Sequence, residues 1–134
     1  MSLLLLLSAA ALAQSAAPQR YQSVTETEYS INLTLEPNGR AQYEFVTWEA
    51  DGSTPEEHEK LSGTWSRNGS VLTVHLSSHR IVTYGVKACL SYEEFGQNGC
   101  SPGLSLIKTD LPDSYGLKRF GLWDSASLHL GTQP

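Results

Sequence analysis

The sequence predicts an all-β protein, an antiparallel β-meander that forms a small barrel or sandwich of about seven or eight strands. Two observations carry this prediction. Apolar and polar residues alternate with period two over segments such as Tyr29–Leu35 and Val71–Leu76, which is typical of strands with one wet face. Turn sequences rich in Gly, Asn and Pro separate these segments, and no stretch sustains the 3.6-residue period of a helix.

The first predicted hairpin has the clearest pattern. Tyr29–Leu35 and residues 41–48 form its strands, and Pro37-Asn38-Gly39 supplies the turn, with Gly in the left-handed position that closes it. Val46 and Trp48 break the alternation of the return strand. We therefore expect a bulge, or a strand buried on both faces, at this point.

The middle of the chain predicts a polar loop followed by a second hairpin. Residues 49–60 form the loop, with room for one helical turn over 55–61 because a proline there suits the first helical position. The alternating pattern resumes at residues 61–65, and Asn68-Gly69 marks the turn into Val71–Leu76. Further strands are predicted over residues 81–86, 103–109, 117–123 and 127–130.

The first residues of the chain have the pattern of an export signal. Residues 3–12 are an apolar run that ends in small residues, as in secretory signal peptides, with cleavage after Ala13 or Ala17. The run is shorter than the roughly 20 apolar residues of a membrane-spanning helix, and no later run is long enough. We expect residues 1–17 to be a signal peptide and residues 18–134 to form one β domain that is exported to the periplasm or beyond.

The two cysteines agree with export. Cys89 and Cys100 are the only ones in the chain, and an even number in an exported protein favours a disulfide. Their spacing differs from the C-x-x-C of redox and metal pairs, so a structural bond is the preferred interpretation. It would close a short loop that contains residues 93–99.

Composition and motifs argue against several function classes. The 134-residue chain has 9 basic and 14 acidic side chains, a net charge of −5, which disfavours nucleic acid as a partner. Catalytic and nucleotide-binding motifs such as G-x-S-x-G, H-E-x-x-H, the P-loop and the Rossmann fingerprint are absent from the sequence. We therefore expect no enzyme activity and no cofactor. The oligomeric state stays open.

Aromatic residues on the predicted inward faces are candidates for a ligand pocket. They are Tyr29, Tyr43, Phe45 and Trp65. In a filled barrel these side chains are core, whereas in an open-mouthed barrel they would line a pocket for a small apolar ligand. A second aromatic set is a candidate interaction surface, consisting of Trp48, Tyr92, Phe95, Phe120 and Trp123.

Polar clusters give weaker candidates. His75 and His79 would approach each other if the chain turns at Ser77-Ser78, but two wet-face histidines beside a turn are the preferred interpretation over a metal site. Acidic residues gather at Glu44, Glu49, Asp51, Glu56, Glu57 and Glu59, either as a site for a cation or basic partner or as a solvated loop. Asp51-Gly52-Ser53 alone lacks the ligand density of a calcium loop.

Residues 29–76 combine an Ile31–Leu35 strand, a Pro37-Asn38-Gly39 turn, Gly63-Thr64-Trp65 and an Asn68-Gly69 turn. This combination resembles the N-terminal barrel of NlpE-type envelope lipoproteins and, more loosely, small lipocalin-like bacterial envelope domains. The resemblance implies a barrel fold, an envelope location and a ligand-binding scaffold. Residues 22–27 lack the C-x-x-C of that family, and the leader lacks its lipidated cysteine, so copper binding and lipid anchoring do not carry over.

Together these features predict an exported, non-catalytic binding protein of the cell envelope that holds a small apolar ligand or an envelope partner. The alternative is a secreted protein-interaction or protease-inhibitor-like module that uses the Cys89–Cys100 loop.

Overall fold

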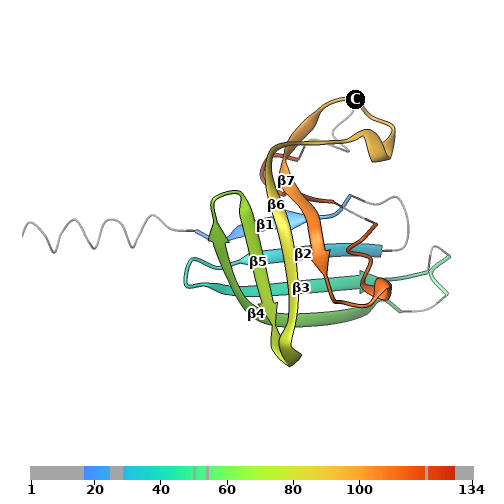
Figure 1. Cartoon of the computed structure of the whole chain (residues 1–134). Helices are drawn as coiled ribbons and strands as arrows, with labels where there is room; N and C mark the ends of the chain where they lie inside the picture. Colours follow the sequence, from blue (N-terminus) through green and yellow to red (C-terminus); the bar gives the residue numbers. More distant parts are fainter. Residues whose placement is uncertain (1–16, 25–28, 50, 54, 120, 129–134) are drawn as a thin grey trace, which may run out of the picture.

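The computed structural model describes residues 17–24, 29–49, 51–53, 55–119 and 121–128, and it confirms the predicted fold class. Eight antiparallel strands follow one another in chain order and close into a barrel in which β8 pairs with β1 (Figure 1). The strands are β1 (Gln19–Gln22), β2 (Tyr29–Leu35), β3 (Arg40–Thr47), β4 (Glu57–Asn68), β5 (Val71–Leu76), β6 (Arg80–Ser91), β7 (Cys100–Thr109) and β8 (Leu122–Asp124). Three short 3-10 turns connect them, η1 (Ser77–His79), η2 (Glu93–Phe95) and η3 (Asp113–Tyr115).

The loop predicted over residues 49–60 is wrong in its last part. Residues 57–60 already belong to β4 and pair with β3, from Thr47 opposite Glu57 to Glu44 opposite Lys60, so there is no helical turn at 57–61. Polar residues are tolerated in this strand because it begins at the rim of the barrel, where even its inward side chains reach water. The strand expected at residues 61–65 is therefore the centre of a longer one.

Of the two alternatives expected at Val46 and Trp48, the structure shows a strand buried on both faces, since the adjacent residues Phe45 and Val46 of β3 are both buried, and it shows no bulge there. Pairing between β2 and β3 is continuous from Tyr29 opposite Thr47 to Leu35 opposite Ala41, and Val46 is buried. The irregularities lie instead between β6 and β7, at Thr83/Tyr84 and again between Lys87 and Leu90. β6 and β7 are 12 and 10 residues long, and bulges let such a long pair bend out of the barrel wall.

The ends of the chain differ most from the prediction. β1 was not expected, because four residues with one buried side chain, Tyr21, give almost no periodic signal. Of the strand predicted over 117–123, residues 117–119 form a turn and only Leu122 and Trp123 enter β8. Residues 127 and 128 lie outside any strand, and 129–130 lie outside the described residues, as does most of the expected signal peptide.

Side chains fill the interior of the barrel. Its centre contains Tyr43 and Tyr84, both almost fully buried, with their hydroxyl oxygens 2.7 Å apart. Aliphatic residues surround this pair, among them Ile31, Leu33, Leu35, Leu72, Val74, Val82, Leu104 and Leu122. Burial of each such side chain contributes about 1.5–3 kcal/mol. For Tyr43, the predicted inward aromatic residue at the barrel centre, the interpretation as a core residue is therefore correct.

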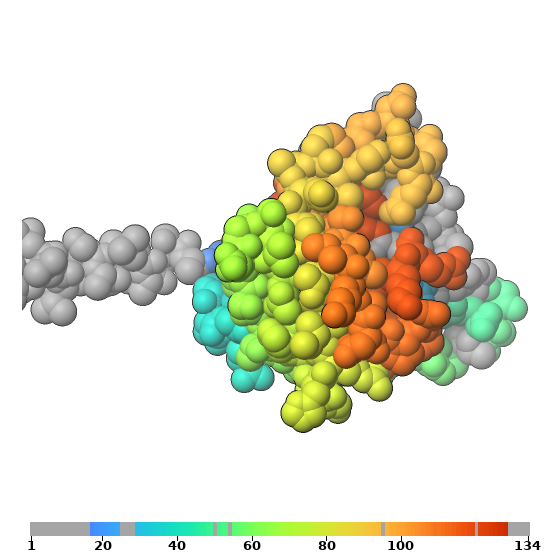
Figure 2. Space-filling model, in the orientation of Figure 1, coloured from blue at the N-terminus to red at the C-terminus, as the bar shows by residue number. Residues whose placement is uncertain are grey.

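The two ends of the barrel are closed differently. At the end with the β2–β3 turn, Trp65 packs against the core and its indole N–H donates to the Glu36 carbonyl at 2.8 Å. At the other end the β7–β8 connection crosses the barrel and inserts Leu111 and Leu117 into the core. η3 lies in this connection, beside the start of β2 and β4 (Figures 1 and 2).

Candidate binding site at the barrel mouth

A depression of about 610 Å³ opens between η3 and the barrel rim. Three aromatic side chains contribute to its walls, Tyr29 from the start of β2, Phe45 from β3 and Tyr115 from η3. The remaining lining residues are polar, namely Thr47, Glu57, His58, Glu59 and Ser114. Two of the four predicted pocket residues, Tyr29 and Phe45, therefore line a real cavity.

Strand register explains why carboxylates face this mouth. Residues directly opposite in an antiparallel pair point to the same face of the sheet. Phe45 is an inward core residue, and it lies opposite Glu59, while Thr47 lies opposite both Tyr29 and Glu57. Glu57 and Glu59 are consequently inward positions of β4 that remain exposed because they lie at the rim.

Contacts from β2, β3 and β4 hold η3 over the mouth. The Tyr115 ring meets Phe45 edge-on, with ring centroids 4.8 Å apart, and its hydroxyl donates to Glu59 Oε1 at 2.7 Å. The Tyr29 hydroxyl donates to the carbonyl oxygen of Tyr115. Gly116 ends the turn with φ +77°, and a Cβ there would lie 2.9 Å from the Tyr29 ring. Glycine is thus required both by the backbone and by the neighbouring ring.

The two tyrosines of this mouth remain protonated donors at neutral pH. Burial, with the nearby charge of Glu59, raises the pKa of Tyr29 to about 12. The hydrogen bond to Glu59 raises the pKa of the Tyr115 hydroxyl above its ordinary value. Both shifts move ionisation further from neutrality, so these hydroxyls keep η3 attached across the physiological range.

The other two predicted pocket residues lie elsewhere. Tyr43 is one layer deeper than Phe45, against which its ring stacks at 5.5 Å, and it is fully buried. Trp65 is half-buried at the opposite end of the barrel. Tyr115 and Ser114 were not predicted as pocket residues, because the sequence of residues 112–116, Pro-Asp-Ser-Tyr-Gly, indicates only a turn. The sequence around Tyr115 gives no local indication that this residue contacts residues on β2 and β3.

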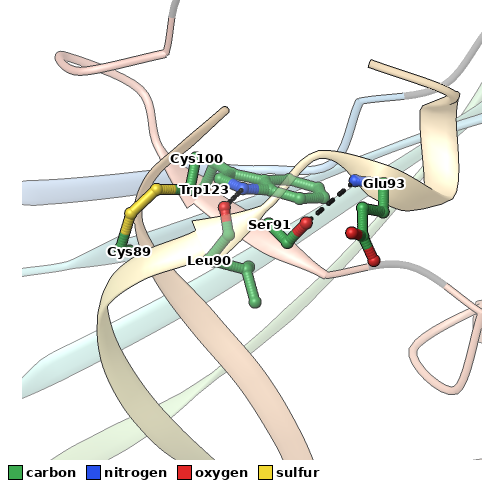
Figure 3. Close-up of a disulfide and its surroundings, with 6 residues drawn as sticks. All are labelled: Cys89, Leu90, Ser91, Glu93, Cys100 and Trp123. Carbon is green, nitrogen blue, oxygen red and sulfur yellow. Dashed lines mark hydrogen bonds between the residues drawn. A yellow bond between two sulfur atoms is a disulfide. The ribbon is translucent and has the colours of Figure 1, made fainter. Parts of the chain in front are cut away.

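Two of the residues that were predicted to form an interaction surface are buried. Tyr92 and Trp123 are 5% and 0% exposed, because the β6–β7 hairpin continues past the barrel and folds over the outward face of β8. Their rings lie 5.9 Å apart, and the Trp123 indole donates to the Leu90 carbonyl at 3.0 Å (Figure 3). Trp48 is half-exposed. The side chain of Phe95 and all of Phe120 lie outside the described residues.

The predicted disulfide is confirmed and lies in the same hairpin (Figure 3). Cys89 near the end of β6 is bonded to Cys100 at the start of β7, with their Cα atoms 5.0 Å apart. β6 runs to Ser91 and β7 begins at Cys100, so residues 92–99, which include the predicted loop at 93–99, connect the two strands. The bond starts from Cys89, within the irregular register between Lys87 and Leu90.

The histidine and acidic candidates are mostly solvated. His75 is exposed on β5 and His79 is exposed in η1, where its φ is +63°. Within the described ranges, no three His, Cys, Asp or Glu side chains are grouped to hold a metal ion. Hydrogen bonding from the Ser53 side chain and, to a smaller extent, from its backbone N–H lowers the pKa of Asp51, which lies in a turn. Glu49 and Glu56 are exposed. Only Glu57 and Glu59 of the acidic set join the aromatic mouth.

Comparison with known proteins adds no relative. A scan against models of protein families, a search of curated proteins and a search of solved structures each gave no match. The resemblance to NlpE-type barrels therefore stays a prediction. By fold, the chain is a closed eight-stranded antiparallel β-barrel with a filled centre and an aromatic, acidic mouth. In the part of the chain that the structure describes, no helix is long and apolar enough to cross a membrane.

Proposed function

We propose that this protein is an exported, non-catalytic binding protein that holds a small ligand with an apolar group at the mouth of its barrel. The single observation that carries the proposal is the depression of about 610 Å³ walled by Tyr29, Phe45 and Tyr115. This volume falls in the range of small-molecule sites, about 300–1,000 Å³, and such sites combine aromatic walls with a few polar groups. The Cys89–Cys100 disulfide is compatible with an oxidising compartment.

The filled centre favours binding at the mouth over binding inside the barrel. Tyr43 and Tyr84 occupy the middle of the barrel and satisfy each other's hydroxyls, so a ligand there would have to displace packed side chains. The mouth requires no such displacement. A ligand would lie beside the packed rings of Phe45 and Tyr115, with its polar end toward the rim.

The hairpin alternative has less support. Tyr92 and Trp123, which were expected to contact a partner, are used to hold the hairpin on β8. The tip from Glu93 to Gly99 is rigidly attached through the disulfide, but its described side chains are polar and offer no apolar anchor of the kind that dominates interface energies. If the hairpin is the functional element, deleting residues 93–98 will abolish capture of a partner while the fold survives.

Native mass spectrometry of the mature protein, purified gently from its own compartment, tests the proposal. A discrete mass above the denatured mass is expected, and it should disappear in Thr47→Trp, which fills the mouth from an inward rim position. The matched control is Thr83→Trp, the same change on the outward face of β6. A bare monomer, or an added mass retained in Thr47→Trp, would overturn a ligand site at the mouth.

A further inference from the structure

The charged side chains that point inward at the mouth are negative. Glu57 and Glu59 both face the depression, two residues apart on β4 and thus separated by about 7 Å along the strand. In the described part of the chain, neither carboxylate is paired with a lysine, arginine or histidine. Glu59 has one oxygen engaged by the Tyr115 hydroxyl.

The basic groups near the mouth have other partners or positions. His58 lies between the two carboxylates in sequence but pairs with Glu44 and Glu56, at 3.6 and 3.3 Å, and Lys60 approaches Glu44 at 3.9 Å. Lys118 pairs with Asp113 on the solvent side of η3. Arg80 is near enough to act electrostatically on Tyr115 but does not line the depression. The mouth therefore presents net negative charge to whatever enters it.

This charge lies next to aromatic walls, and the combination selects a class of ligand. Tyr29, Phe45 and Tyr115 provide ring surfaces, and aromatic rings attract cations through their negative faces by about 0.5–2 kcal/mol. A hydrated divalent metal ion is a poor fit, since Ca²⁺ needs six to eight oxygen ligands and only two carboxylates face the site. A quaternary ammonium ion, whose nitrogen carries no N–H group, is weakly hydrated and can contact rings and carboxylates together.

We propose that the ligand of the mouth is an organic cation, with its apolar group on Phe45 and Tyr115 and its ammonium group toward Glu57 and Glu59. This inference rests on the proposed binding function and specifies the chemistry of its ligand. Its basis is the inward orientation of two carboxylates without basic partners at the edge of an aromatic cavity.

Three probes of similar size separate the contributions of charge and shape. Benzyltrimethylammonium carries the cation, neopentylbenzene is its uncharged carbon isostere, and phenylacetate carries the opposite charge. Their affinities are measured by NMR titration at low salt, following the backbone amides of the β4 and η3 residues. We expect the cation to bind about tenfold tighter than the neutral isostere and the anion to bind weakest.

Single carboxylate changes then identify the source of the preference. Glu57→Gln should weaken binding of the cation several-fold and leave binding of the neutral isostere unchanged. Glu93→Gln is the control, because it removes the same charge from an exposed position on the distant hairpin. Thermal unfolding of both variants confirms that each folds.

The outcomes distinguish the two proposals. Equal affinity for the cation and its isostere, or equal effects of Glu57→Gln and Glu93→Gln, would overturn the charge inference while the mouth still binds an apolar group. No binding of any probe by the wild-type protein, with amide shifts no larger than in Thr47→Trp, would overturn the binding site itself. A preference for phenylacetate would reverse the assigned charge.

Discussion

The buried tyrosine pair at the barrel centre gives the sharpest test of the filled-core interpretation. Tyr43 and Tyr84 are 0% and 1% exposed, and their hydroxyl oxygens lie 2.7 Å apart. Each hydroxyl has the other as its partner in a place that water does not reach. The perturbation is to replace the tyrosines by phenylalanine, singly and together.

The expected magnitudes follow from polar satisfaction. Tyr84→Phe leaves the Tyr43 hydroxyl buried without its partner, which costs about 1–3 kcal/mol of the free energy of unfolding. Tyr43→Phe does the same to Tyr84. The double variant removes both polar groups and keeps both rings, so it should lie within about 1 kcal/mol of the wild type. The coupling energy between the two positions is then about 1 kcal/mol or more.

Urea unfolding of the four proteins, with the midpoint and slope fitted separately, measures this cycle. Constant slopes show that the variants share one unfolded reference. If the double variant loses as much as the two single variants combined, the hydroxyls do not depend on each other. That result would mean that water or a cavity reaches the centre, and a ligand site inside the barrel would have to be reconsidered.

Three further predictions concern the strands, the hairpin and the response to pH. Gly63→Ala should cost more than about 4 kcal/mol or prevent folding, because the new Cβ would lie 1.9 Å from the His75 carbonyl oxygen; a soluble variant with an unchanged melting temperature contradicts this. Joint replacement of Cys89 and Cys100 by serine should lower the free energy of unfolding by about 3 kcal/mol, measured with urea, and should leave probe binding at the mouth intact. Burial raises the pKa of Tyr84, so its contribution is complete below pH 10, where unfolded tyrosine is protonated, and is lost as the pH rises toward the folded-state pKa. The expected loss is about 1.4 kcal/mol per pH unit for each such tyrosine, and urea midpoints that stay constant from pH 9 to 11.5 would contradict it.

The sequence predicted the fold class because most strands carry a local signal. In β2 and β5 the inward residues are apolar and the outward ones mostly polar, so period two identifies both strands and their faces. The start of β4 has no such signal. Glu57 and Glu59 are inward but exposed to water, and only the pairing with the neighbouring strand β3 makes this segment a strand. Strand ends at a rim are therefore the part of a barrel that hydrophobic patterning describes least well.

Two of the three aromatic residues of the mouth were predictable from the alternating pattern of their strands. Tyr29 and Phe45 lie on strands whose inward faces the alternation reveals, whereas Tyr115 reaches the mouth from a connection 86 residues away from Tyr29 in the chain. The burial of Trp123 was not predicted either, because it also depends on a contact between segments that are distant in the chain. An aromatic residue on the outward face of a short strand predicts exposure, and only the return of the hairpin over β8 buries it.

The location of the site follows from a gradient along the inward faces of neighbouring strands. From the centre to the rim, β3 changes from Tyr43 to Phe45 to Thr47, and β4 changes from Leu61 to Glu59 to Glu57. Each step of two residues is about 7 Å, so polarity rises from a sealed core to an acidic edge within the length of one small molecule. A ligand that is apolar throughout would leave the exposed carboxylates without a partner, and a fully polar one would leave the rings uncovered. The arrangement therefore favours a molecule that is apolar at one end and positively charged at the other, bound with its charge outward.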